Sequence, residues 1–270
     1  MNNKYLEVYL QTLKSKCTKD TYETSIKQML EYVGKPEQEI SRLDLTMWLN
    51  HIKETYSTAT EAVKLNAVKG YFNFLYDNEI IDNNVADKLK GDKIVNKPKQ
   101  ALTKEDALKM LEMARSLRDK AIIAMYLSTG LRVQELIDLT LDDYQEETLV
   151  IKTKGEKYRS IVLNKDCKAY IDAYLVVRKD GSNNLFTSNR GTALHRNNIG
   201  TMLKSLAKKC GIEVNVTNHT FRSTFVTEIA REHGVLMAQQ AVGHSRVDTT
   251  QRYVRGLEKE VKDIMTSITL

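Results

Sequence analysis

Proline and glycine are scarce in this sequence, and their scarcity is the strongest constraint on its fold. The 270 residues include only 2 prolines and 12 glycines, whereas an average protein has about 5% proline and about 7% glycine. Both residues interrupt helices, proline because it lacks a backbone N–H and glycine because of its conformational freedom. We therefore expect a mainly α-helical protein, long enough for two domains of about 100–200 residues each.

The composition excludes several classes of protein. Hydrophobic residues make up 41% of the chain and charged residues 28%, which excludes a disordered or collagen-like chain. No apolar run approaches the length of a membrane span or a signal peptide, so we expect no membrane partner. Three cysteines, Cys17, Cys167 and Cys210, are too few and too scattered for a disulfide framework or a zinc cluster. We interpret them as reduced thiols in a cytoplasmic protein.

The net charge of +6 suggests a polyanionic partner, although mildly basic proteins are common. Residues 1–100 contain 15 Lys and Arg against 14 Asp and Glu, and the remainder contains 26 against 21. Most of the positive excess therefore lies in the second part of the chain.

Apolar residues spaced three and four apart predict a four-helix module in the first 90 residues. The helices are expected near residues 3–15, at 18–33 with Thr18 as N-cap, from Ser41, and from Ser57 to about Asp77. Ser41 and Asp44 form a predicted capping box. A polar, basic segment follows. We therefore expect a first domain at 1–90, a linker at 91–101 and a second domain at 102–270.

The second domain is predicted to be helical around one β-hairpin. Thr103 and Asp106 occupy the positions of a capping box, and residues 118–128 are apolar enough for a buried helix. Two β-prone runs, 148–153 and 158–163, flank a turn and predict the hairpin. A short strand is expected at 185–187. Helices are expected at about 164–178, at 195–210 and from about 219 onward.

Four segments of the second domain carry side chains that suit a phosphate group. In the segment 129–136, a glycine turn precedes Arg132 at the start of a helix, where an arginine offers a forked donor to phosphate oxygens. The hairpin turn carries Lys152, Lys154 and Lys157, any of which could act as a general acid. The alternatives are a surface pair of Arg132 with Glu135 and a solvated lysine-rich tip.

The other two segments lie in the last fifth of the chain. His219 and Arg222 are three residues apart and share a helix face. Tyr253 lies between Arg252 and Arg255, where cations could stabilise a phenolate nucleophile, although a tyrosine is more often a core residue. No carboxylate cluster has metal-ligand spacing, so we expect no metal and no cofactor. Together the four segments indicate metal-free phosphoryl transfer, in which cationic side chains stabilise the pentacoordinate phosphorane.

These segments, in this order, resemble the boxes of the tyrosine recombinases, the family of phage integrases and Xer-type recombinases. Thr129-Gly130-Leu131-Arg132, with Glu135, is similar to the box of the first catalytic arginine, and Lys154 falls at the position of the hairpin lysine. His219-Thr220-Phe221-Arg222 resembles the His-x-x-Arg box. Gly243-His244, with Tyr253 nine residues after the histidine, resembles the box of the nucleophile. Phe221, Ser223 and Val242 depart from common family residues at non-catalytic positions.

The resemblance implies a fold and a reaction. The fold is a four-helix core-DNA-binding domain and an α-rich catalytic domain with a small β-hairpin, without the additional arm-binding domain of some integrases. The enzyme is a site-specific recombinase that cleaves and rejoins DNA through a 3′-phosphotyrosyl intermediate and a Holliday junction. The implied catalytic residues are Arg132, Lys154, His219, Arg222, His244 and Tyr253, with Glu135 orienting them.

The resemblance also implies partners: double-stranded recombination sites, a homotetramer on DNA, and accessory DNA-bending or directionality proteins. An apolar stripe of Leu257, Val261, Ile264 and Ile268 predicts a C-terminal oligomerisation helix. Packing of this helix against its own subunit or against a neighbouring one stays open. Two other functions are compatible with the same residues: a type IB topoisomerase, and a DNA-binding regulator with an inactive site.

Overall fold

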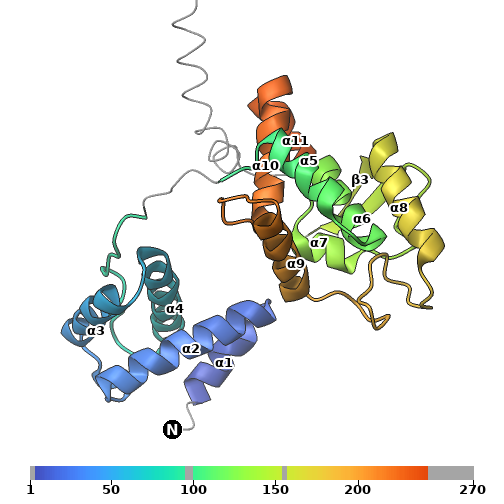
Figure 1. Ribbon diagram of the computed structural model, residues 1–270. Coiled ribbons are helices and arrows are strands. Elements are labelled where there is room, and N and C mark those ends of the chain that lie inside the picture. The colour runs from blue at the N-terminus through green and yellow to red at the C-terminus, as the bar shows by residue number, and fades with distance from the viewer. Residues whose placement is uncertain (1–3, 95–99, 154–156, 243–270) are drawn as a thin grey trace, which may run out of the picture. The chain divides into compact units, whose positions relative to one another are not determined.

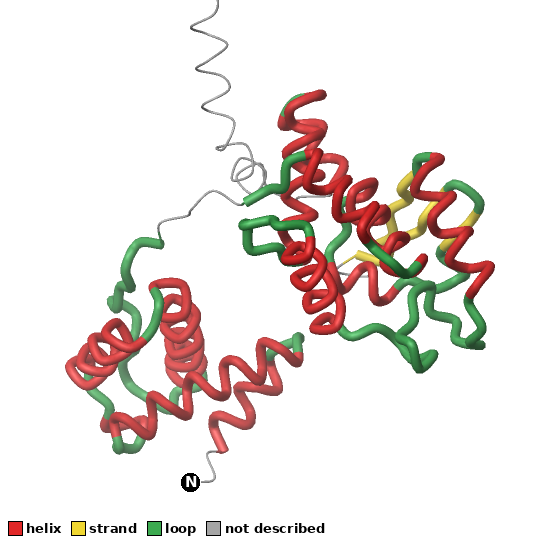
Figure 2. Tube along the Cα trace, in the orientation of Figure 1, coloured by secondary structure: helices red, strands yellow, loops and turns green. Residues whose placement is uncertain are grey.

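The computed structural model describes residues 4–94, 100–153 and 157–242. The chain divides into two compact units, Met1–Val95 and Asn96–Leu270. Helices dominate both units, and the strands are confined to the second (Figure 2). Among the described residues, no helix is both long enough and apolar enough to cross a membrane.

Unit 1 contains the four expected helices (Figure 1). They are α1 (Lys4–Thr12), α2 (Lys16–Val33), α3 (Arg42–Thr55) and α4 (Thr58–Asp77), with a short 3-10 helix, η1 (Glu37–Glu39), before α3. Their apolar faces enclose one core, in which Trp48 of α3 and Tyr71 and Phe72 of α4 are almost completely buried. This core gives unit 1 its own source of stability, because burial of aromatic side chains contributes most per residue.

The helix boundaries of unit 1 follow its capping residues. The Ser41 hydroxyl accepts a hydrogen bond from the Asp44 N–H at 3.2 Å, and the Asp44 carboxylate accepts one from the Ser41 N–H at 2.9 Å. This confirms the predicted capping box. The prediction for Thr18 was wrong: α2 begins at Lys16, with Ser15 in the N-cap position. Thr18 is the third residue of the helix, and the first helical backbone hydrogen bond runs from the Lys19 N–H to the Ser15 carbonyl at 2.9 Å, so the helix has already started before Thr18.

The first residues of the expected linker, 91–101, pack on the helices of unit 1. The Asp92 N–H donates to the Glu61 carboxylate at 3.0 Å, and the Asp92 carboxylate pairs with Lys53 at 2.6 Å. Residues 95–99 lie outside the described residues. The described part of the 91–101 segment therefore includes residues fixed to the helices of unit 1.

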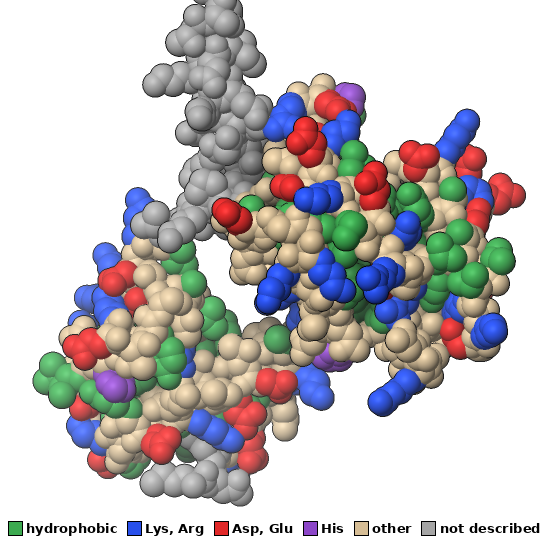
Figure 3. Space-filling model, viewed as in Figure 1, with side chains coloured by type: hydrophobic (Ala, Val, Ile, Leu, Met, Phe, Trp, Pro, Cys, Tyr) green, Lys and Arg blue, Asp and Glu red, His purple; other side chains and the backbone are tan. Residues whose placement is uncertain are grey.

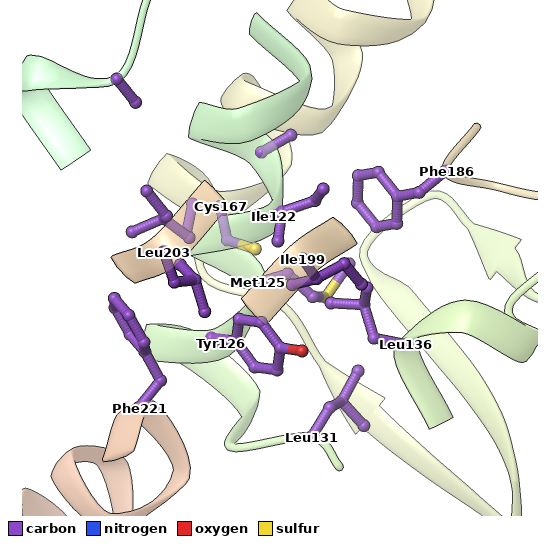
Figure 4. Close-up of a cluster of buried hydrophobic side chains, with 14 of the residues drawn as sticks. Ile122, Met125, Tyr126, Leu131, Leu136, Cys167, Phe186, Ile199, Leu203 and Phe221 are labelled. Atoms are coloured by element: carbon purple, nitrogen blue, oxygen red, sulfur yellow. The ribbon is translucent and has the colours of Figure 1, made fainter. Parts of the chain in front are cut away.

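Unit 2 is built around α6, a helix that is buried over most of its length. Its helices are α5 (Lys104–Met113), α6 (Leu117–Thr129), α7 (Val133–Asp138), α8 (Lys165–Val177), α9 (Arg196–Lys209), α10 (Asn218–His233) and α11 (Val235–Val242). Figure 4 shows Met125 and Tyr126 of α6 in one buried cluster with Ile199 of α9 and Phe221 of α10. The predicted buried helix at 118–128 is thereby confirmed. Of the predicted capping box at Thr103 and Asp106, one half is present: the Thr103 hydroxyl accepts from the Asp106 N–H at 3.0 Å.

The small sheet confirms the predicted hairpin and adds a strand. Its order is β1 (Tyr144–Gln145), β2 (Thr148–Thr153) and β3 (Lys157–Val162), all antiparallel. The strand expected at 185–187 is not formed: this stretch makes only isolated bridges, Thr140 with Asn184 and Thr187 with Ala193. Leu185 and Phe186 are nevertheless fully buried, so their β-prone, apolar character reflects core packing of an irregular segment.

Within the described residues, the helical region expected from residue 219 onward contains two helices, α10 and α11. Gly234, with φ of +85°, separates α10 from α11. A glycine in this conformation ends a helix without the steric cost that a side chain would add. The break turns the chain so that α11 packs against α10, where Val226, Ala230, Ala238 and Val242 form a separate small core.

Candidate active site

The first arginine box is formed where α6 ends and α7 begins. Gly130 has φ of +58°, a left-handed conformation, and its N–H closes α6 by donating to the Tyr126 carbonyl at 2.9 Å. Leu131 is buried in the core, which fixes the turn and leaves Arg132 exposed at the start of α7. The sequence folds this way because glycine tolerates the left-handed turn and leucine anchors it.

Glu135 holds Arg132 in place and is held in turn by a second arginine. The Glu135 carboxylate accepts from the Arg132 N–H and from Arg132 Nη1, both at 2.8 Å. Arg159 Nη2, from β3, lies 3.5 Å from Glu135 Oε2. The side chain of Arg132 is 47% exposed, while that of Glu135 is only 9% exposed. Arg132 is therefore held in one orientation by Glu135 while its guanidinium is exposed to solvent. This geometry suits binding of a phosphate.

Arg222 joins two boxes that are far apart in sequence. It is 2% exposed. Its Nη1 donates to the carbonyl of Gly130, and its Nη2 donates to the carbonyl of Val242 at 3.1 Å. The first acceptor precedes Arg132 by two residues, and the second immediately precedes the Gly243-His244 box. A buried charge is costly unless it is hydrogen-bonded, so Arg222 fixes both backbone segments relative to α10.

His219 lies in the first turn of α10, one turn before Arg222, and is exposed. Two contacts hold this turn. The Thr217 hydroxyl accepts from the Thr220 N–H at 3.3 Å, and the hydroxyl of Tyr126 donates to the Asn218 side chain at 3.3 Å. The ring of Tyr126 also stacks on Phe221, with centroids 5.9 Å apart. The start of α10, which carries His219, is therefore anchored to the last turn of α6, directly before the first arginine box.

The structure brings together Arg132, Glu135 and Arg222 through the Gly130 turn. Lys154, His244 and Tyr253 lie outside the described residues. Of the other two hairpin lysines, Lys152 is exposed on β2, and the side chain of Lys157 also lies outside the described part. The residue that sequence reasoning missed is Arg159. A signal for it exists: Arg159 shares one face of β3 with Ile161, and Leu163 continues the same spacing just after the strand, so a charged residue at 159 interrupts an apolar pattern.

Charge is unevenly distributed over unit 2. On the face that Figure 3 shows, Lys and Arg side chains form a band across the middle of the unit, and most Asp and Glu side chains lie above it. This distribution agrees with the charge counts, which place most of the positive excess after residue 100. A surface of this kind favours a polyanion.

Comparison with known proteins decides the family. The pattern of the phage integrase family matches residues 100–260. The chain belongs to this family. Residues 3–79 match a second pattern, the N-terminal SAM-like domain of phage integrases. The family assignment makes the protein a tyrosine-type site-specific recombinase that acts on DNA, and it confirms the fold and activity that the sequence motifs predicted.

Relatives in the phage integrase family include several Xer recombinases. The tyrosine recombinase XerA of Pyrococcus horikoshii is 32% identical over 219 residues, which cover 78% of this chain and 74% of that protein. The tyrosine recombinase XerD of Oceanobacillus iheyensis is 28% identical over 270 residues, covering 93% and 91%.

Solved structures of phage integrase relatives share the fold. A crystal structure of XerA recombinase matches with a TM-score of 0.57 at 28% identity and covers 98% of both chains. A XerH recombinase bound to a palindromic difH substrate matches with a TM-score of 0.79 at 22% identity, covering 92% of this chain and 79% of that one. A lambda integrase dimer bound to a core site matches with a TM-score of 0.76 at 18% identity, covering 92% and 93%.

Proposed function

We propose that this recombinase cleaves DNA with Tyr253 as nucleophile and with Arg132, Lys154, His219, Arg222 and His244 as the other catalytic residues. The observation that carries the proposal is the position of Arg222. It contacts the turn before Arg132 and the carbonyl of Val242, and thereby supports assembly of three sequence boxes into one site. Glu135 orients Arg132 through its two 2.8 Å hydrogen bonds.

In the proposed reaction, the Tyr253 oxygen attacks the scissile phosphorus while the bond to the 5′-oxygen breaks. The tyrosine proton passes to His219, and Lys154 protonates the departing 5′-oxygen. Arg132, Arg222 and His244 bind the non-bridging oxygens as negative charge develops on them. The products are a 3′-phosphotyrosyl bond and a free 5′-hydroxyl. The new ester retains the energy of the phosphodiester, so a 5′-hydroxyl of a partner strand reverses the step without ATP or metal.

The proposal extends to the assembly and its location. The SAM-like module at 1–90 and the catalytic module at 102–270 both bind the duplex, and the basic segment 91–101 connects them. A homotetramer on two recombination sites in the cytoplasm, with accessory DNA-bending or directionality proteins, completes strand exchange through a Holliday junction. Support comes from the lambda integrase structure, which is a dimer on a core site, and from the basic band of unit 2 (Figure 3).

The test uses nicked suicide DNA substrates built from the sequence that flanks the gene. Wild-type protein should form a covalent adduct that survives SDS electrophoresis, and Tyr253→Phe should form none. Tyr158→Phe is the matched control, because Tyr158 is a 65% exposed tyrosine in the same unit and should leave the adduct unchanged. An adduct that persists in Tyr253→Phe would refute the assignment of the nucleophile. Absence of any adduct with folded wild-type protein would refute the proposed chemistry on these sites.

Assembly is tested separately with the C-terminal stripe at 257–268, which lies outside the described residues. Deletion of residues 257–270 should abolish cooperative assembly on paired sites and spare binding to a single site. Tetramer formation by the truncated protein, measured by analytical ultracentrifugation with DNA, would contradict this role of the tail.

A further inference from the structure

Arg159 of β3 lies on the face of the hairpin that also carries the buried Leu149 and Ile151. The register of the hairpin pairs Ile151 with Arg159 and Leu149 with Ile161, and residues directly opposite each other share a face. Leu149 and Ile151 are buried, with 0% and 1% exposure. The pKa of Arg159 is lowered, mainly by burial and also by the nearby charge of Arg132. The Glu135 carboxylate opposes this shift only in part. The guanidinium is therefore placed where desolvation works against its charge.

The two ends of the Arg159 guanidinium reach different parts of the site. Nη2 lies 3.5 Å from the carboxylate of Glu135, which binds Arg132 on its other side. Nη1 lies 3.5 Å from the carbonyl of Ala241, near the end of α11. One side chain of the hairpin thus touches both the support of the first catalytic arginine and the last turn of the helix that leads to the nucleophile box.

Ala241 and Val242 show how this end of α11 is held. The last carbonyls of a helix have no partner within it. Here the Ala241 carbonyl accepts from Arg159 on β3, and the Val242 carbonyl accepts from Arg222 on α10. Two cations at a helix C-terminus also interact favourably with its dipole. The end of α11, after which the chain continues to His244 and Tyr253, is therefore hydrogen-bonded by arginines from two different elements.

We infer that Arg159 is a positioning residue for DNA cleavage, which orients Arg132 through Glu135 and fixes the start of the nucleophile segment through the Ala241 carbonyl. The inference rests on the proposed roles of Arg132 and Tyr253.

Stability alone gives no reason for an arginine at this place. Within the described part of the chain, Arg159 Nε is buried without a hydrogen-bond partner, and an unsatisfied buried donor destabilises the fold. An apolar side chain of similar length would pack against Leu149 and Ile151 without that penalty. The contacts of Arg159 that do form all lead toward the site.

The test compares Arg159→Met with Arg159→Lys in single-turnover cleavage of the suicide substrate. It is carried out on a substrate on which the wild-type protein is known to form the covalent adduct. Misplacement of reacting groups by about 1 Å costs about 100-fold in rate. Arg159→Met should therefore cleave about 10- to 100-fold more slowly, with DNA affinity within about threefold of wild type and no loss of thermal stability. Arg159→Lys retains the charge and should recover part of the rate.

A double-mutant cycle with Glu135→Gln separates positioning from general damage. If Arg159 acts through Glu135, its substitution in the Glu135→Gln background should cost clearly less than in wild type. Arg178→Lys is the control. Arg178 is also buried, but it pairs with Asp180 at 2.5 Å after α8, so its substitution should lower the melting temperature and leave the cleavage rate unchanged.

Three results would overturn the inference: wild-type cleavage in Arg159→Met, a rate loss matched by an equal loss of DNA affinity, or independent effects in the cycle. Failure of wild-type protein to form an adduct would instead refute the proposed function itself.

Discussion

Gly130→Ala tests the turn on which the first arginine box depends. The left-handed backbone at φ of +58° costs a non-glycine residue about 1–2 kcal/mol. A Cβ at this position would lie 2.4 Å from Cδ1 and 2.9 Å from Cγ of Phe225, and overpacking of this kind costs about 1–3 kcal/mol. We expect the free energy of unfolding of unit 2 to fall by about 2–5 kcal/mol. Cleavage should also slow, because the Gly130 carbonyl accepts from Arg222.

Gly34→Ala is the matched control for this experiment. Gly34 also ends a helix and has φ of +66°, but a Cβ added there would meet no neighbouring atom within 4 Å. Its substitution should therefore cost only the backbone strain of about 1–2 kcal/mol. The one tryptophan of the chain, Trp48, is buried in unit 1. Urea unfolding followed by its fluorescence reports unit 1, and far-UV circular dichroism reports both units.

Equal costs for the two substitutions would refute the packing argument, because the collision with Phe225 would then contribute nothing. A second check is Phe225→Leu in the Gly130→Ala background, which removes the ring and should recover part of the lost stability. Absence of any recovery would point to backbone strain as the whole effect.

Three further predictions address the rest of the molecule. Hydrogen bonds from Lys35 and Ser41 lower the pKa of Asp44 to about 2. The ionised carboxylate therefore stabilises the folded state above about pH 4, and this stabilisation is lost as the pH falls toward 2. Asp44→Asn should remove this part of the acid sensitivity of unit 1, measured by urea unfolding at several pH values. The buried Thr224 hydroxyl accepts from the Leu102 N–H at 2.8 Å, so Thr224→Val should lower the stability of unit 2 by about 1–3 kcal/mol without changing the fluorescence transition. The logarithm of the affinity for a recombination site should fall linearly with the logarithm of the salt concentration, with a slope of about −0.9 for each neutralised phosphate. A flat titration would contradict phosphate contacts.

Much of the fold could be predicted because its signals are local. Helix periodicity located all four helices of unit 1, and the hydroxyl caps at Ser41 and Thr103 marked where helices begin. The errors have local causes as well. Ser15 competes with Thr18 as the start of α2, and Gly234 after a basic last turn is a helix-ending signal that the apolar pattern around it concealed. Strand β1 pairs through only two residues, too few for any periodicity to show.

The active site divides in the same way between local and distant signals. Arg132 with Glu135, and His219 with Arg222, are each three residues apart, so motifs could identify them. The partners of Arg159 and Arg222 could not be found from sequence, because several of them are backbone carbonyls.

A carbonyl is present at every residue, so an arginine that binds one leaves no complementary side chain elsewhere in the chain. Contacts of this kind are fixed by the path of the backbone, here by the Gly130 turn and by the end of α11. The sequence motifs therefore identify the reactive side chains of the site, whereas turns and helix ends determine how these side chains are aligned. Substitutions that alter backbone conformation at these places should disturb cleavage more than substitutions of the non-catalytic side chains beside them.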